Sequence, residues 1–176
     1  MSDAHHVQIV DHHQIAELAT RAGAAPRKRT HLLLHDGPED PVQRLIIVLQ
    51  PNTYVRPLHH SRQWEMLVLQ QGRGNQLIFD GDARLMDRIE LSPRSPVVQI
   101  PIGVWHGFVV LEPNTAVLEI KPGPYRPNEF ADWAPEEGGR KRKSICRMDN
   151  KCTIRREMVD CRITVRPLSF VLAKAR

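Results

Sequence analysis

The sequence predicts an all-β domain of short antiparallel strands, preceded by one short helix. Apolar residues, mostly Val, Ile and Leu, occur in short runs that are separated by turn residues at a spacing of roughly 8–12 residues. Only one helical pattern is present, so no second helix is available to connect parallel strands. The strands are therefore expected to form an antiparallel sandwich or barrel.

The helix is expected near the N-terminus, within a segment of residues 1–25. Its apolar residues follow the i, i+3, i+4, i+7 spacing that places side chains on one helical face: Ile15, Leu18, Ala19 and Ala22. Asp11 precedes this pattern and is a candidate N-cap, and Gly23 is expected to end the helix.

Seven strands are expected after Pro26, in a barrel domain of residues 26–138. They cover residues 42–50, 64–69, 75–79, 85–91, 97–100, 107–111 and 115–121. The proline-rich stretch that follows Lys121 cannot continue a strand ladder, because proline has no backbone N–H to donate. Residues 133–135 are expected to form an irregular cover.

Charge divides the chain into two compositions. Residues 1–138 hold 13 Lys and Arg against 17 Asp and Glu, whereas residues 139–176 hold 12 against 3 and contain all three cysteines. The cysteine spacing matches no zinc pattern. We expect residues 139–176 to form a basic, weakly ordered tail. A nucleic-acid-binding arm is the alternative, disfavoured because Phe170 is the only aromatic residue available for base stacking.

Membrane insertion and secretion are not expected. The apolar runs are far shorter than the roughly 20 residues that a membrane-spanning helix needs. The first ten residues lack the basic start and apolar stretch of a secretory signal. The cytoplasm is therefore the expected location.

One glutamate stands among apolar residues on a predicted strand. Glu65 shares a strand face with Leu67 and Leu69, and a lone buried carboxylate is costly. The natural partners are His60 and His106, and two imidazoles with one carboxylate suit a divalent metal ion such as Fe, Mn, Ni or Zn. In the alternative interpretation, His60 and Glu65 form a hydrogen-bonded pair and His106 caps a turn.

Two motifs resemble those of a known family. Residues 57–72 look like the first cupin motif, and Pro101 to His106 looks like the second, P-x-G-x-x-H. Further stretches resemble the WbuC-type cupin-fold metalloproteins: residues 44–46, 54–57, 64–65, 105–106, 119–125 and 133–135. This resemblance extends from about residue 26 to residue 138.

The resemblance implies a cupin double-stranded β-helix, or jelly-roll barrel, with a metal bound inside. It also implies a bacterial protein whose relatives are associated with lipopolysaccharide O-antigen synthesis. His60, Glu65 and His106 match the second, third and fourth ligand positions of the cupin pattern. Leu58 stands at the first position, where the pattern has histidine, and His59 is offset by one residue and should face away.

Other polar residues are candidates for contact with a substrate. Tyr54 and His35 are candidates for moving a proton, and the candidates for binding an anionic ligand are Arg56, Arg44 and Lys121. In the alternative, Glu119 pairs with Lys121 or Arg44 and the charges are structural.

These observations lead to two functional hypotheses. The first is a metal-binding pocket protein that acts on a sugar or sugar nucleotide; whether it is an enzyme is left open, because a fold alone does not define a reaction. The second is a non-catalytic small-molecule binder whose metal site degenerated at Leu58. A homodimer is compatible with both.

Overall fold

The computed structural model describes residues 7–137, which form one helix and ten strands. In chain order they are α1 (His12–Ala24), β1 (Arg29–Leu33), β2 (Val42–Leu49), β3 (Leu58–His59), β4 (Glu65–Gln71), β5 (Gly74–Phe79), β6 (Leu85–Leu91), β7 (Val97–Ile100), β8 (Trp105–Val110), β9 (Thr115–Pro122) and β10 (Glu129–Phe130). The predicted basic tail and its cysteines lie outside the described residues. Within residues 7–137, no helix has the length and apolar character needed to cross a membrane.

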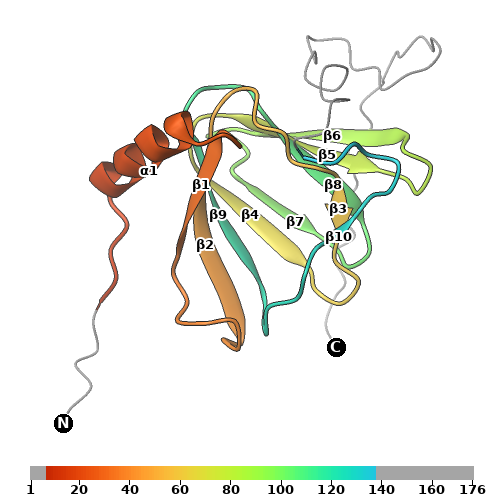
Figure 1. Ribbon diagram of the computed structural model, residues 1–176, viewed down its shortest axis with the longest axis horizontal. Coiled ribbons are helices and arrows are strands. Elements are labelled where there is room, and N and C mark those ends of the chain that lie inside the picture. Colours follow the sequence, from red (N-terminus) through yellow and green to blue (C-terminus); the bar gives the residue numbers. More distant parts are fainter. Residues whose placement is uncertain (1–6, 138–176) are drawn as a thin grey trace, which may run out of the picture.

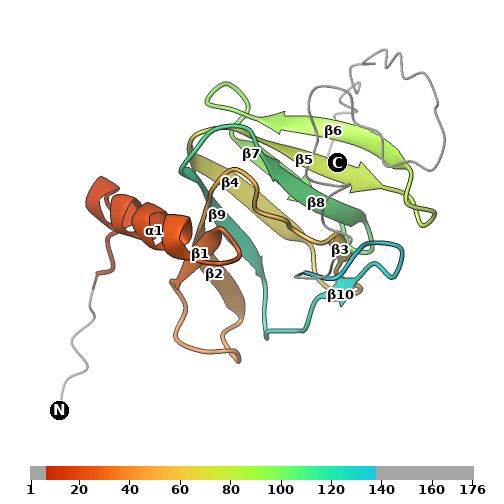
Figure 2. The same ribbon diagram turned by 45° about the horizontal axis from the view of Figure 1, so that its top comes forward.

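The strands form two five-stranded sheets that are the walls of one barrel (Figures 1 and 2). One sheet has the order β1-β2-β9-β4-β7 and the other the order β10-β3-β8-β5-β6. The paired strands are antiparallel throughout. The predicted all-β architecture with an N-terminal helix is therefore confirmed.

Helix α1 covers the outer face of the first sheet, over β1 and β2 (Figure 1). Its apolar face packs on strand residues that point away from the barrel interior: Ile46, Val48 and Ala116. Asp11 caps the helix as predicted, since its carboxylate accepts a hydrogen bond from the Gln14 backbone N–H (2.9 Å).

The prediction that Gly23 ends the helix is wrong. The helix continues to Ala24, and the chain becomes extended at Ala25 (φ −68°, ψ 140°). Ala25 precedes Pro26, whose ring disfavours helical backbone in the residue before it. The proline, not the glycine, therefore sets the end of α1.

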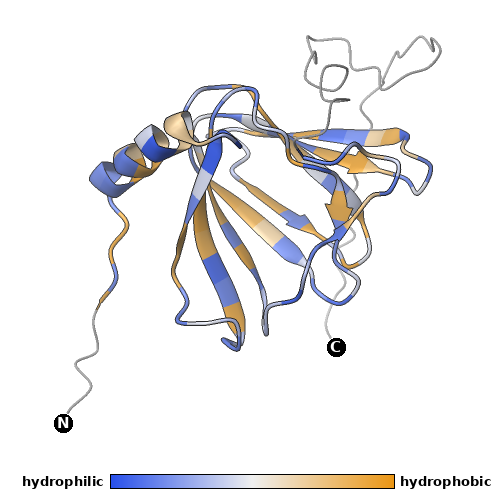
Figure 3. Cartoon of the chain, in the orientation of Figure 1, coloured by the Kyte–Doolittle hydropathy of each residue, from blue (hydrophilic) through white to orange (hydrophobic). Residues whose placement is uncertain are grey.

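Figure 3 shows apolar stretches along several strands, and β2 has five consecutive apolar residues at positions 45–49, so both of its faces are apolar. Inward-facing residues of both sheets form a second apolar cluster inside the barrel: Leu49, Leu67, Leu69, Leu91, Phe108 and Val117. The barrel therefore has an apolar interior on one side of the first sheet and the helix on the other.

All seven predicted strands exist, as β2 and β4 to β9, with bounds shifted by two residues at most. Three strands were not predicted as such. β1 is an edge strand that pairs only with β2, and β3 and β10 have two residues each. Such short strands exist because partners from distant segments pair with them, so local sequence carries little signal for them.

The end of β9 is tied to two loops. The amide nitrogen of Gly123 donates to the carbonyl of Pro41 (2.8 Å). The Gln63 side chain donates to the carbonyls of Pro122 and Pro124, the latter at 3.0 Å. The Gly123 bond connects the strand that carries Lys121 to the loop between β1 and β2, and the Gln63 bonds connect it to the loop between β3 and β4.

The contact at Gly123 gives a test of this connection. A methyl group at Gly123 would collide with the backbone carbonyl of Asp40, which cannot move away as a flexible side chain could. We expect Gly123→Ala to lower the free energy of unfolding by about 2–3 kcal/mol, measured by urea denaturation. Gly37→Ala is the matched control, because no described atom lies within 4 Å of its added methyl group. Equal stability of the two variants would contradict the packing described.

Candidate functional site

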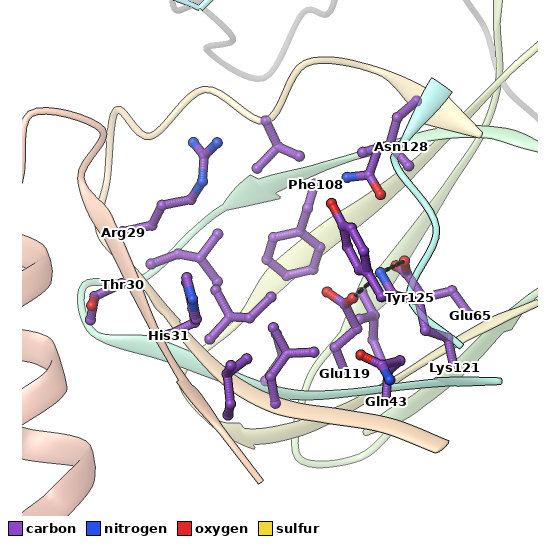
Figure 4. A pocket seen from close by; sticks show the side chains of 18 of the residues that line it. Arg29, Thr30, His31, Gln43, Glu65, Phe108, Glu119, Lys121, Tyr125 and Asn128 are labelled. Atoms are coloured by element: carbon purple, nitrogen blue, oxygen red, sulfur yellow. Dashed lines mark hydrogen bonds and ion pairs between the residues drawn. The ribbon is translucent and has the colours of Figure 1, made fainter. Parts of the chain in front are cut away.

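A cavity of about 770 Å³ lies between the two sheets. Its volume falls within the range typical of small-molecule sites, roughly 300–1,000 Å³. Figure 4 shows polar side chains on opposite sides of it, with Phe108 between them: Glu65, Glu119 and Lys121 on one side, and Arg29, Thr30 and His31 on the other.

Two histidines and a glutamate meet at one end of the cavity. His60 follows β3, Glu65 begins β4, and His106 is the second residue of β8. The Nε2 atom of His60 lies 2.9 Å from Oε2 of Glu65, and Nε2 of His106 lies 3.6 Å from Oε1. All three side chains are buried. The structure thus brings the three predicted metal ligands together.

The turn before β8 orients His106. Its Nδ1 atom lies 2.8 Å from the backbone carbonyl of Val104, so Nδ1 carries a proton and Nε2 faces Glu65. The amide of Gly103, a residue with φ 77°, donates to the carbonyl of His60 (2.8 Å). That bond connects the turn to the loop that holds the other histidine.

The cluster stabilises its own charges. Burial alone would raise the pKa of Glu65, but the interactions with His106 and His60 and the charge of Lys121 hold it well below the usual carboxyl range. Burial lowers the pKa of His106, and contact with Glu65 more than reverses this effect. Glu65 is therefore a carboxylate that needs compensating positive charge.

These three side chains fit a divalent metal ion. One donor atom from each of His60, Glu65 and His106 lies within 4.8 Å of the others. Metal–ligand bonds of about 2.0–2.2 Å require donors roughly 4 Å apart or less, so a small inward movement of side chains suffices. The contact between Nδ1 of His106 and a backbone carbonyl is the usual outer-shell support of a metal-binding histidine.

Leu58 and His59 lie as their strand positions require. Leu58 pairs with His106 across β3 and β8 and lines the cavity, so an apolar side chain stands next to the three donors. His59 faces the opposite way, against Trp105, with Nε2 at 3.3 Å from Glu129. His59 therefore does not replace the missing histidine.

Lys121 and Glu119 form an ion pair beside the three donors. Nζ of Lys121 lies 2.6 Å from Glu119 and 3.9 Å from Glu65. Burial and the charge of Glu65 raise the pKa of Glu119. Burial alone would lower the pKa of Lys121. The charges of Glu119 and Glu65 outweigh this effect and raise the pKa above its usual value, so the amine stays protonated. This pair can donate to, and accept from, a bound molecule.

The other predicted site residues are distributed differently. Arg56 and His35 line the cavity, and each already has a backbone partner: Arg56 donates to Ala131 (2.8 Å), and Nδ1 of His35 lies 2.8 Å from the carbonyl oxygen and 3.0 Å from the amide nitrogen of Arg44. The Arg44 side chain is outside the cavity lining, because β2 turns residues of its parity outward. The hydroxyl of Tyr54 donates to Pro135 (2.9 Å), also outside that lining.

The sequence analysis did not identify several polar residues that line the cavity, among them Gln76, Arg27, Arg29 and Glu137. Gln76 on β5 is 1 % exposed, and neither its amide nitrogen nor its oxygen has a partner among the described residues. Arg27 and Arg29 line the far end. Arg29 and His31 are two residues apart in an extended stretch, and this spacing could have indicated that both side chains point to the same face. Nothing local distinguishes Gln76 from any other polar residue on a strand.

A family model described as a domain of unknown function (DUF6016) matches residues 10–91, less than half of the chain. The matched segment includes His60 and Glu65 and ends before His106. None of the curated proteins matches the sequence.

Solved structures support a cupin barrel. A cupin 2 domain-containing protein from Halorhodospira halophila aligns with a TM-score of 0.50 and 15 % identity, over 60 % of this chain and 71 % of that chain. At this identity the likeness establishes the fold alone, and the predicted cupin β-barrel fold is confirmed. The WbuC-type assignment stays a prediction.

Two further structures align with lower scores. KdgF from Halomonas sp. has a TM-score of 0.47 and 20 % identity, over 58 % of this chain and 84 % of that chain. Procruciferin, an 11S globulin from Brassica napus, has a TM-score of 0.45 and 13 % identity, over 51 % of this chain. The chain spans 23 % of the length of that globulin.

Restoring a donor at position 58 tests the geometry of the site. We expect Leu58→His to tighten binding of Zn²⁺ or Ni²⁺ by about tenfold or more, since even outer-shell changes alter affinity on this scale. Competition with a chelating dye measures the change. His59→Gln is the control, because His59 faces Trp105 and its loss should leave metal affinity unchanged. An effect of His59→Gln as large as that of Leu58→His would contradict the assigned strand faces.

Proposed function

We propose that this chain is a metal-dependent cupin that binds a small organic molecule over a three-ligand metal centre. The observation that carries the proposal is the buried cluster of His60, Glu65 and His106, of which Glu65 and His106 line a cavity of about 770 Å³. A bound divalent ion would supply Lewis acidity there. The cavity volume suits a small molecule.

The chain's own residues complete the site. Lys121 presents a protonated amine next to Glu65, so it can donate a hydrogen bond to a ligand oxygen near the cluster. Gln76 offers both a donor and an acceptor that no described residue uses. A buried amide without partners costs about 1–3 kcal/mol of stability, which a ligand bond would recover. Gln76 is therefore assigned to ligand contact.

The resemblance to WbuC-type proteins supports a finer proposal for the ligand and its context. On that basis the substrate is a sugar or sugar nucleotide of bacterial lipopolysaccharide O-antigen synthesis, handled in the cytoplasm. Of the residues predicted to contact substrate or move a proton, His35, Arg56 and Lys121 line the cavity, so we assign substrate contact to these three. Thermal shifts with a panel of sugar nucleotides test this assignment, and uniform absence of a shift would count against it.

The second candidate function is a metal-free small-molecule binder. Two observations favour it: Leu58 offers no donor, and Lys121 already places a positive charge 3.9 Å from Glu65. In this case Lys121 takes over the compensation of the buried carboxylate.

Metal content distinguishes the two candidates. We expect the full chain, purified without a metal-affinity tag, to contain about one Fe, Mn, Ni or Zn ion per molecule, and Glu65→Gln to lose it because the carboxylate is a ligand. Elemental analysis measures both. Glu129→Gln is the matched control, since Glu129 pairs with His59 outside the cluster. Metal that appears only after Leu58→His would favour the metal-free binder.

A further inference from the structure

The cavity has a cationic end opposite the metal-ligand cluster. Arg27 and Arg29 line this end, and Figure 4 shows Arg29 on the side of the cavity away from Glu65 and Lys121. β1 places Arg29 on the inward face, because it pairs with Leu49, which also lines the cavity. The two ends therefore differ in charge and in chemistry.

Arg29 is held in position by the protein backbone. Its Nη1 atom donates to the carbonyl of Tyr54 (2.7 Å) and lies 3.4 Å from the hydroxyl of Thr53. Its side chain is 16 % exposed. The other terminal nitrogen, Nη2, contacts the carboxylate of Glu137. A guanidinium fixed in this way is prepared to bind a carboxylate with little loss of side-chain entropy.

Glu137 occupies the place between the two arginines. One of its carboxylate oxygens contacts Arg29, and the other lies 2.5 Å from Nη2 of Arg27. Glu137 follows β10 in a segment without strand pairing, so moving its side chain breaks no ladder bond. The structure thus shows a carboxylate bound at the cationic end, supplied by the chain itself.

The wall between the two ends is apolar apart from Gln76, which pairs with Phe108 across β5 and β8. It is formed by inward-facing residues of both sheets and of the segment before β3: Leu45, Ile47, Leu49, Val55, Leu67, Phe108 and Val117. A ligand that extends from the arginines toward Glu65 must pass along these side chains. An apolar body is favoured there, because burying unpaired hydroxyl groups against such a wall costs free energy.

We propose that Arg27 and Arg29 form a carboxylate subsite for an organic acid with an apolar body, and that Glu137 occupies this subsite until the acid displaces it. This inference rests on the proposed metal-dependent cavity and names a ligand class for it, in place of the sugar or sugar nucleotide that the family resemblance suggests. The acid group binds the arginines, and the opposite end of the molecule reaches the cluster of His60, Glu65 and His106.

Octanoate is the probe that tests the subsite, with 1-octanol as its uncharged counterpart. We expect the full chain to bind octanoate at least tenfold more tightly than 1-octanol in isothermal titration calorimetry. Glu137→Gln removes the competing charge and should tighten octanoate binding threefold or more. Arg27→Ala, at an arginine whose side chain is 60 % exposed, should weaken octanoate binding at least fivefold without unfolding the chain.

The controls separate this subsite from general charge effects. Arg84→Ala removes an exposed arginine between β5 and β6 and should leave octanoate affinity unchanged. Equal affinity for octanoate and 1-octanol, or an unchanged affinity in Glu137→Gln, would overturn the proposal and make the Glu137 pairs structural. Tighter binding of glucuronate than of octanoate would contradict the proposal that the body of the ligand is apolar.

The test also distinguishes this inference from the metal-dependent function. Octanoate is titrated into Glu65→Gln and into the chelator-treated chain as well. Arginine-dependent binding that persists in both supports the carboxylate subsite even if elemental analysis finds no metal. If the chain binds metal but Arg27→Ala and Glu137→Gln leave octanoate affinity unchanged, the carboxylate subsite is contradicted and the metal-dependent function is not.

Discussion

A carboxylate buried between two sheets needs positive charge or hydrogen-bond donors beside it. In this barrel such a carboxylate is Glu65, and strands of both sheets place partners around it. Glu65 begins β4, and the two imidazoles and the ammonium group around it come from the loop after β3, from β8 and from β9. Removing any one of these partners would leave a buried charge partly unpaired, which is costly in a low-dielectric interior. The arrangement therefore constrains both sheets at once, and the same charge would attract a divalent cation to the cluster.

The first sheet serves two purposes because its two faces differ. Strands β2 and β9 pack apolar residues against α1 on the outer face and carry cavity residues on the inner face. The backbone bonds at Gly123 and the side chain of Gln63 hold the end of β9. The position of Lys121 relative to Glu65 thus depends on contacts made by loops outside the cavity. Packing of α1 on the outer face of this sheet therefore helps to fix the strand that carries Lys121 and Glu119 on the inner face.

The cavity retains features that stability alone does not explain. Gln76 buries an amide without partners among the described residues, and Leu58 puts an apolar group beside three polar donors. Conflicts of this kind are expected where a site is shaped by a ligand. The apolar wall and the pair of arginines at the far end favour an extended molecule with one acidic group. Metal and ligand binding would then share a single cavity with two chemically different ends.

The sequence by itself determined the positions of seven strands, the cap at Asp11 and the identity of the three donors, because these follow from short apolar runs, a local capping pattern and two short motifs. It also placed Leu58 and His59 on opposite faces, since side chains alternate strictly along a strand. Tertiary structure decided the rest. Arg44 turned outward, Tyr54 bonded to Pro135, and Glu137 reached Arg29 across more than a hundred residues of chain. Such contacts join segments whose local patterns are independent of each other, so only the packing of the two sheets could bring them together.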